Sequence, residues 1–195
     1  MRRCGLERPP LAPPFLKAGP LLIGQTAAIL LYLGERHGLA PASAAGRLWT
    51  HQLQLTLADF LQEAHDTHHP IASRLYYEDQ RTEAKRRAAD FLAARAPKYL
   101  DYFEGVLALN RAGDRHLVGA RLTYPDLSLF QIVAGLRYAF PRAMARLERR
   151  HRRVLRLHDR IAARPRIRAY LASERRLAFN EEDIFRRYRE LDSGR

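Results

Sequence analysis

The sequence predicts a mainly α-helical protein in which a short α/β segment precedes a larger all-helical domain. Two short apolar runs flank a Gly-Pro turn within residues 15–23, which is the pattern of a β-hairpin. An apolar run at residues 27–33 follows directly and indicates a helix. From residue 44 onward, apolar residues recur at spacings of three and four, which is typical of amphipathic helices.

A first domain is expected over residues 1–38. Its opening stretch, residues 1–12, is rich in arginine and proline and lacks periodicity, so we expect it to be disordered or extended. After the hairpin, a helix should begin at Thr26, because threonine is a favoured residue at a helix start. It should end at Gly34 or Gly38, because glycine favours helix ends.

The second domain is expected over residues 44–195, after a linker at about residues 35–43. The first helix of this domain should break at His69-Pro70. The tail from Phe179 to Arg195 is polar, and we expect it to be largely irregular. The first helix of this domain carries one apolar stripe, which is formed by Leu53, Leu57, Leu61 and Ala64.

Four further helices are predicted in this domain. One spans about residues 82–109, where Pro97 should kink it because proline lacks an N–H group. Another, at residues 127–136, is apolar on all sides and should therefore be buried. One narrow apolar face predicts a single helix over about residues 142–164, and a short last helix should start near Pro165.

Composition limits the class of protein. The chain has 195 residues, of which 47% are hydrophobic and 28% charged, and this suits a soluble protein with a sizeable core. Its apolar runs are too short to cross a membrane, and no apolar signal core follows the basic start. Cys4 is the only cysteine, so no internal disulfide can form, and a reducing cytoplasm is the expected compartment.

The net charge of +13 raises the question of nucleic acid as a partner. The arginines that could form such a surface flank the apolar face of the helix at residues 142–164, and no aromatic residue for base stacking lies among them. We therefore expect a solvated helix side, and nucleic-acid binding is the weakest alternative. These arginines are Arg146, Arg149, Arg150, Arg152, Arg153 and Arg156.

A histidine cluster is the candidate metal site. His65 and His69 are four residues apart, so a helix would place them on one face, as zinc sites require. However, no glutamate follows the first histidine as a metalloprotease motif requires, and no distant third ligand is evident. We expect no metal here, and a pocket-wall or packing role for the cluster.

Three motifs, in this order, resemble the cytosolic glutathione transferases of bacterial type. They are the Pro-Pro-Phe-Leu string before the hairpin, the Gln-Thr-x-x-Ile-x-x-Tyr-Leu string at residues 25–33, and the Thr-x-x-Asp box at residues 123–126. The resemblance implies that residues 1–38 are part of a thioredoxin-like glutathione-binding domain. It also implies that residues 44–195 are the family's all-helical C-terminal domain.

The resemblance implies glutathione as co-substrate and assigns residues to it. Gln25 and Thr26 match residues that hold the γ-glutamyl carboxylate, and a helix N-terminus offers that carboxylate free N–H groups. Pro14 matches the family's cis-proline. Pro13 matches the residue that pairs with the cysteinyl part, but as a proline it offers only its carbonyl. Asp59 lies where several classes place an aspartate that reaches the γ-glutamyl ammonium across the dimer. The alternative for Thr26 is that it only caps the helix. The alternative for Asp59 is a solvated position on its helix.

The same resemblance implies a cytoplasmic homodimer that conjugates glutathione to hydrophobic electrophiles, a detoxification reaction. His68, His69 and Tyr76 lie in the stretch expected near the electrophile pocket. The Thr-x-x-Asp box at residues 123–126 is expected to cap a helix rather than to take part in chemistry.

The family's catalytic residue has no counterpart in this sequence. In the family, a Tyr, Ser or Cys after the first strand donates to the glutathione thiolate or reacts itself. No such segment precedes Pro13, and Cys4 is too near Pro14 to replace it. We therefore expect an N-terminally truncated chain of weak activity, with weak order in residues 1–25 unless they pack on the helical domain or a partner. A non-catalytic interaction module built on the helical domain is the alternative.

Overall fold

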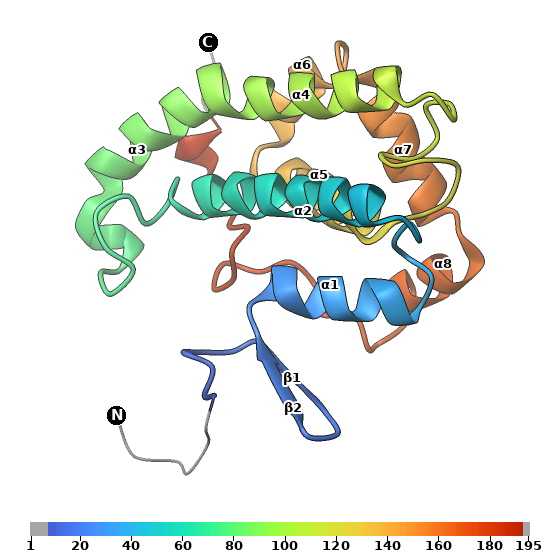
Figure 1. Cartoon of the computed structure of the whole chain (residues 1–195). Helices are drawn as coiled ribbons and strands as arrows, with labels where there is room; N and C mark the ends of the chain where they lie inside the picture. Colours follow the sequence, from blue (N-terminus) through green and yellow to red (C-terminus); the bar gives the residue numbers. More distant parts are fainter. Residues whose placement is uncertain (1–7, 193–195) are drawn as a thin grey trace.

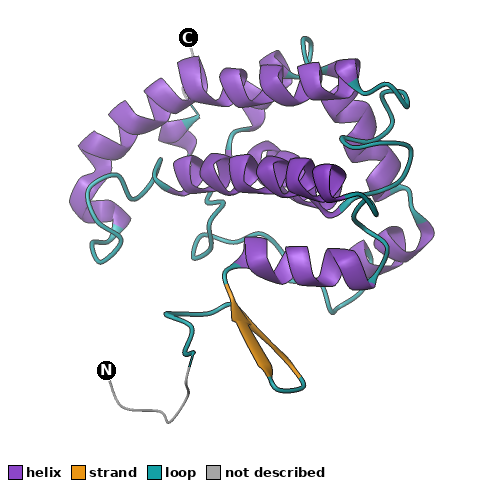
Figure 2. Cartoon of the chain, in the orientation of Figure 1, coloured by secondary structure: helices purple, strands orange, loops and turns teal. Residues whose placement is uncertain are grey.

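The N-terminal part of the fold is a β-hairpin followed by one helix. The structure is a computed structural model that describes residues 8–192, so Cys4 lies outside the described residues. Strands β1 (Phe15–Ala18) and β2 (Leu21–Gly24) pair antiparallel, with Phe15 opposite Gly24. The hairpin projects away from the helical body next to the start of α1 (Thr26–Arg36) (Figure 1). Among the described residues, strand occurs only in this hairpin (Figure 2).

Helix α1 begins at Thr26 as predicted but continues through Gly34. A Cβ atom at Gly34 would lie only 2.4 Å from the Tyr124 ring, so the glycine lets α1 lie close against the start of α5. The helix ends at Arg36, and Gly38, at φ 67°, follows in the turn. The sequence alone could not distinguish a glycine that ends a helix from one that allows a close contact.

The centre of the helical body is the pair formed by α2 (Ala44–His65) and α5 (Tyr124–Ala139), which pack against each other (Figure 1). The expectation that α5 is buried is confirmed, since most of its residues are inaccessible to solvent. The capping box is also confirmed. The Asp126 carboxylate accepts from the backbone N–H and the hydroxyl of Thr123, each at 2.7 Å, and from the N–H of Leu117 at 2.7 Å.

The predicted kinked helix at residues 82–109 consists of α3 (Arg81–Asp90), a π-helical turn η2 (Phe91–Arg95) and α4 (Ala96–Leu109). A short 3-10 turn, η1 (Tyr77–Gln80), precedes them. Pro97 has no N–H to donate, and its ring would clash with the carbonyl four residues earlier. That carbonyl belongs to the π-helical turn, whose wider backbone spacing relieves the conflict.

The prediction of one helix over residues 142–164 is wrong, because the structure has two helices there. They are α6 (Pro141–Leu147) and α7 (Arg152–Ala162). The buried His151 lies at the break and bridges the Leu147 carbonyl (2.6 Å) and the Asp101 carboxylate (2.9 Å). The carboxylate of Glu104 then accepts from the first backbone N–H groups of α7 and serves as its cap.

The last helix and the tail complete the body. Helix α8 (Pro165–Leu171) starts at the predicted proline. The tail is irregular as expected, apart from the 3-10 turn η3 (Arg189–Leu191), but it packs onto the body. Phe185 and Leu191 are buried, and Asp192 accepts from two backbone N–H groups at the start of α6. None of the helices formed by residues 8–192 has the length and apolar character that crossing a bilayer requires.

Candidate functional site

The start of α1 presents unsatisfied backbone donors beside a strained residue. Gln25, which precedes the helix, has φ 64° and ψ 121°, a conformation that non-glycine residues rarely adopt. No side chain caps α1, and its first turn holds no acidic residue. The first N–H groups of the helix therefore carry their partial positive charge without an internal partner. Gln25 and Thr26 are both exposed.

A cavity of about 650 Å³ lies between this helix start and the outer face of α2. Its walls come from α1, from α2, from the loop after α2 and from the tail. The lining residues are Gln25, Thr26, Ala27, Ala28, His51, Leu55, Ala58, Leu61, Gln62, His65, Ser73 and Ile184.

Hydrogen bonds orient several polar side chains of this cavity. The Gln62 amide donates to Asp66 at 2.7 Å, and His65 Nδ1 lies 3.3 Å from the same carboxylate oxygen. His51 Nδ1 lies 3.5 Å from the Tyr124 hydroxyl. The cavity thus combines an open helix N-terminus with amide, hydroxyl and imidazole groups, a set suited to a small polar ligand that carries a carboxylate.

The residues predicted to hold glutathione are only partly brought together. Gln25 and Thr26 both line the cavity. The peptide bond between Pro13 and Pro14 is cis, but neither proline lines the cavity. Asp59 is exposed on α2 and does not line the cavity in this single chain.

None of the three residues predicted for the electrophile pocket lines this cavity. His68 is buried, with Nε2 2.8 Å from the Ile184 carbonyl and Nδ1 2.5 Å from Nδ1 of His69. Burial lowers the pKa of His68 to about 4, although the bond to the carbonyl opposes the shift. His68 thereby holds the tail residue Ile184 at the cavity. Tyr76 is 78% exposed and, like His69, lines no part of the cavity.

Two rings of the histidine cluster are stacked, and the His68 ring meets both of them edge-on. The rings of His65 and His69 lie nearly parallel, with centroids 5.1 Å apart. Within residues 8–192, no group of three or more His, Cys, Asp or Glu side chains is arranged to hold a metal ion.

A second hollow of about 420 Å³ adjoins the first, since Leu61 and Ile184 line both. Sequence reasoning missed this hollow because it treated the tail as a polar, irregular segment. Three apolar residues of the tail, Phe179, Ile184 and Phe185, were the available signal. The remaining lining residues are Gln131, Tyr170, Arg175, Arg176, Leu177, Ala178, Phe179, Asp183 and Phe185.

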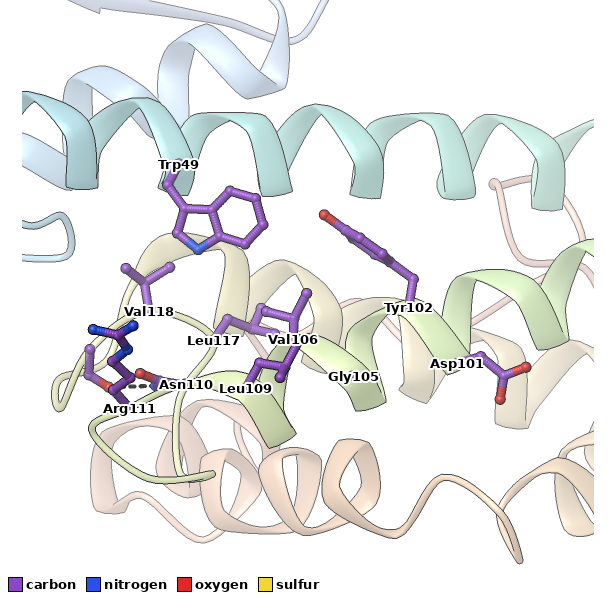
Figure 3. A pocket seen from close by; sticks show the side chains of 11 residues that line it. Trp49, Asp101, Tyr102, Gly105, Val106, Leu109, Asn110, Arg111, Leu117 and Val118 are labelled. Carbon is purple, nitrogen blue, oxygen red and sulfur yellow. Dashed lines mark hydrogen bonds between the residues drawn. The ribbon is translucent and has the colours of Figure 1, made fainter.

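An apolar groove of about 570 Å³ lies elsewhere, between the start of α2, the end of α4 and the loop that follows α4 (Figure 3). The Trp49 and Tyr102 rings reach toward it from two facing helices, as Figure 3 shows. Leu109, which lines the groove, is 82% exposed, and Leu48, the neighbour of Trp49 in the chain, is 73% exposed. Such a contiguous exposed apolar surface is typical of an interface.

The comparisons with known proteins agree with this fold. A family model described as "Glutathione S-transferase, C-terminal domain" matches residues 65–174. Glutathione S-transferase P 1 of Xenopus laevis is 26% identical over 170 residues, which are 84% of this chain and 69% of that protein. A glutathione S-transferase of Plasmodium falciparum (isolate 3D7) is 24% identical over 135 residues, which are 67% of this chain and 57% of that protein.

Two solved structures share the fold. A Pi-class glutathione S-transferase of Onchocerca volvulus superposes with a TM-score of 0.62 at 18% identity, over 78% of this chain and 66% of that one. The rat hPGDS complexed with a quinoline superposes with a TM-score of 0.65 at 20% identity, over 82% of this chain and 72% of that one. Because the family match covers more than half of the chain, this protein belongs to the glutathione S-transferase family.

Proposed function

We propose that this chain binds glutathione at the start of α1 and serves its conjugation to a hydrophobic electrophile. The observation that carries the proposal is the backbone of Gln25, held at φ 64° beside an uncapped helix N-terminus that lines the cavity. A non-glycine residue in such a conformation costs about 1–3 kcal/mol, and strain of this kind gathers at ligand-binding sites.

The γ-glutamyl group of glutathione fits the chemistry of this end of the cavity. Its carboxylate would accept from the Thr26 hydroxyl and from the free N–H groups of the first turn of α1. The Gln25 amide would supply a further hydrogen bond. We assign the Pro13 carbonyl to the cysteinyl part, and Asp59 of the second copy in a dimer to the γ-glutamyl ammonium.

The electrophile is assigned to the second hollow, which adjoins the cavity through Leu61 and Ile184. Its aromatic side chains from the tail suit an apolar molecule. Of the residues predicted for electrophile binding, His68 would act by positioning the tail through Ile184. His69 and Tyr76 line neither hollow, so a direct role for them would require the tail to move.

We further propose that the chain is a cytoplasmic homodimer. The apolar groove bounded by Trp49 and Tyr102 supports the dimer, because a second copy could cover it together with the exposed Leu48 and Leu109. The groove shares no lining residue with either ligand hollow. Light scattering of the purified chain should give twice the monomer mass, whereas the Trp49→Glu variant should be monomeric.

The proposed activity is tested with immobilised glutathione and an aromatic halide. We expect retention of the chain on the matrix, elution by free glutathione, and conjugation above the uncatalysed rate. Thr26→Ala should clearly weaken retention. Thr56→Ala, which removes a hydroxyl bonded only to the Gln52 carbonyl of its own helix, should not. Retention without conjugation would support binding and exclude catalysis by this chain.

A further inference from the structure

A hollow of about 300 Å³ lies between α7 and the loop that precedes α5, and it shares no lining residue with the proposed glutathione and electrophile sites. Its lining combines basic side chains with a short apolar wall. The residues are Arg115, His116, Leu157, Arg160, Ile161, Ala163 and Arg164.

Two buried nitrogen atoms in this lining have no hydrogen-bond partner. Among the described residues, three buried side-chain nitrogen or oxygen atoms are left without one, and two of them are His116 Nδ1 and Arg160 Nε. A buried donor without an acceptor costs about 1–3 kcal/mol, so folded proteins seldom retain one that has no other use. Arg160 Nε is therefore a donor that a group bound in the hollow would satisfy, whereas His116 Nδ1 lies 3.9 Å from the buried Asp126 carboxylate.

Positive charge accumulates around the hollow and is only partly compensated by Asp114 and Asp126. The guanidinium of Arg160 donates to the carbonyls of Asp114 (3.1 Å) and Arg115 (2.8 Å), neither of which carries a full charge. The Asp114 carboxylate is engaged by Arg156 at 2.8 Å. Over residues 8–192, no carboxylate forms an ion pair with Arg115, Arg160 or Arg164. Burial, reinforced by the charge of Arg115, lowers the pKa of Arg160.

His116 connects the hollow to a buried carboxylate. Its Nδ1 lies 3.9 Å from the carboxylate of Asp126, which is fully buried at the start of α5. Burial foremost, with the charges of Arg160, Arg115 and Arg164, lowers the pKa of His116, and Asp126 opposes that shift. An anion in the hollow would favour the protonated ring, as the nearby Asp126 carboxylate does.

We propose that this hollow binds a phosphate group, free or as the monoester of a small molecule, through the guanidinium groups of Arg115, Arg160 and Arg164 and the imidazole of His116. A phosphate dianion offers oxygens in several directions and can accept from guanidinium groups that approach from different sides. A single carboxylate would neutralise less of the charge and would reach fewer of these donors.

The test uses the full chain and isothermal titration with inorganic phosphate, glycerol phosphate and acetate at constant ionic strength. We expect saturable binding of phosphate and much weaker binding of acetate. Binding of inorganic phosphate alone identifies the free ion as the ligand, and binding of both phosphates identifies the shared group. The ring signals of His116 should shift in NMR spectra as phosphate is added, because that side chain lines the site.

Two matched variants distinguish a specific phosphate site from non-specific attraction of phosphate by the positive charge of the chain. Arg164→Gln should weaken phosphate binding about tenfold, through loss of one charge-assisted contact. Arg164 directly precedes α8, but its side chain forms no capping hydrogen bond there. Arg152→Gln makes the same charge change on exposed α7 surface outside the hollow and should alter the affinity by less than about twofold. Equal weakening by both variants, or no saturable binding by the parent chain, would overturn the proposal.

Discussion

The hairpin and helix α5 bury their side chains to very different extents. No residue of β1 or β2 is buried, and Phe15 and Leu21 are 54% and 45% exposed. In contrast, ten of the 16 residues of α5 are buried. Since hydrophobic burial is the main source of folding free energy, stability must be concentrated in the helical body.

Helix α1, which carries the proposed glutathione contacts, lies between these extremes. Gly34 is its one buried residue, and its first turn faces a cavity rather than a packed core. The proposed site therefore joins a weakly anchored helix start to the firmly packed helix α2. Ligand-binding segments are often drawn from the less stable parts of a protein, because they must open and close.

The largest effect is expected at the capping box of α5. Asp126→Ala should lower the free energy of unfolding by about 3 kcal/mol, because it leaves the buried N–H groups of Leu117 and Thr123 without acceptors. Urea unfolding monitored by circular dichroism measures this. A loss below about 1 kcal/mol would show that α5 is not the element on which the body depends.

A smaller effect, with a defined pH dependence, is expected at Glu63 on α2. Arg95 donates to its carboxylate from both Nε and Nη2, and the Tyr99 hydroxyl donates at 2.9 Å. These bonds, the one from Arg95 foremost, lower the pKa of Glu63 from 4.5 to about 2. Glu63→Gln should therefore cost about 2 kcal/mol at neutral pH, as expected for hydrogen bonds to a charged group.

The pH dependence follows from the sign of this shift. The unfolded chain takes up the proton of Glu63 first, as the pH falls below about 4.5, so the contribution is complete above that pH and is lost toward pH 2. The difference in stability between the parent chain and Glu63→Gln should shrink over this window. Glu78→Gln, which breaks an exposed pair with Arg81, should change stability by less than about 0.5 kcal/mol.

A still smaller change in stability is expected at Gln25. Here relief of the backbone strain should raise the stability rather than lower it. Gln25→Gly should make the protein about 1 kcal/mol more stable than Gln25→Ala, because glycine adopts φ 64° without steric cost. Both variants lose the amide and should bind glutathione equally weakly. Thermal unfolding and binding assays of the two variants, run in parallel, separate backbone strain from side-chain contact. Equal stability of the two variants would argue against strain at this position.

The smallest effect is expected in the hairpin. Phe15→Ser should change the free energy of unfolding by less than about 0.5 kcal/mol, because its side chain is largely exposed. Hydrogen exchange should be fast at backbone amides of β1 and β2 and slow in α5. Slow exchange in the hairpin would indicate that another molecule covers it.

Features that depend on neighbours in sequence were predictable. The hairpin, the start of α1 and the box formed by Thr123 and Asp126 each depend on residues within a few positions of one another. The break between α6 and α7 was not predictable, because it depends on Asp101 and Glu104, which lie about fifty residues earlier in the chain. The apolar stripe through His151 concealed the break, since a buried histidine with two partners resembles a core residue in a sequence pattern.

The candidate site likewise has one part that the sequence predicted and another part that it could not predict. The Gln-Thr string identified one end of the cavity, because the motif lies on a single helix start. The opposite wall could not be predicted, since His51, Gln62 and His65 belong to α2 and meet α1 only through packing across the linker. The tail that contributes Ile184 and Phe185 could be recognised as packed only once the body it covers was known.

Calorimetric titration of the chain with glutathione and with cysteinylglycine, which lacks the γ-glutamyl group, tests the proposed glutathione site most directly. We expect glutathione to bind and cysteinylglycine not to bind. Thr26→Ala should weaken glutathione binding about tenfold, as expected for loss of a hydrogen bond to a charged group, while Thr56→Ala should leave it unchanged. Equal binding of the two peptides, or unaltered affinity in Thr26→Ala, would contradict a glutathione site at the start of α1.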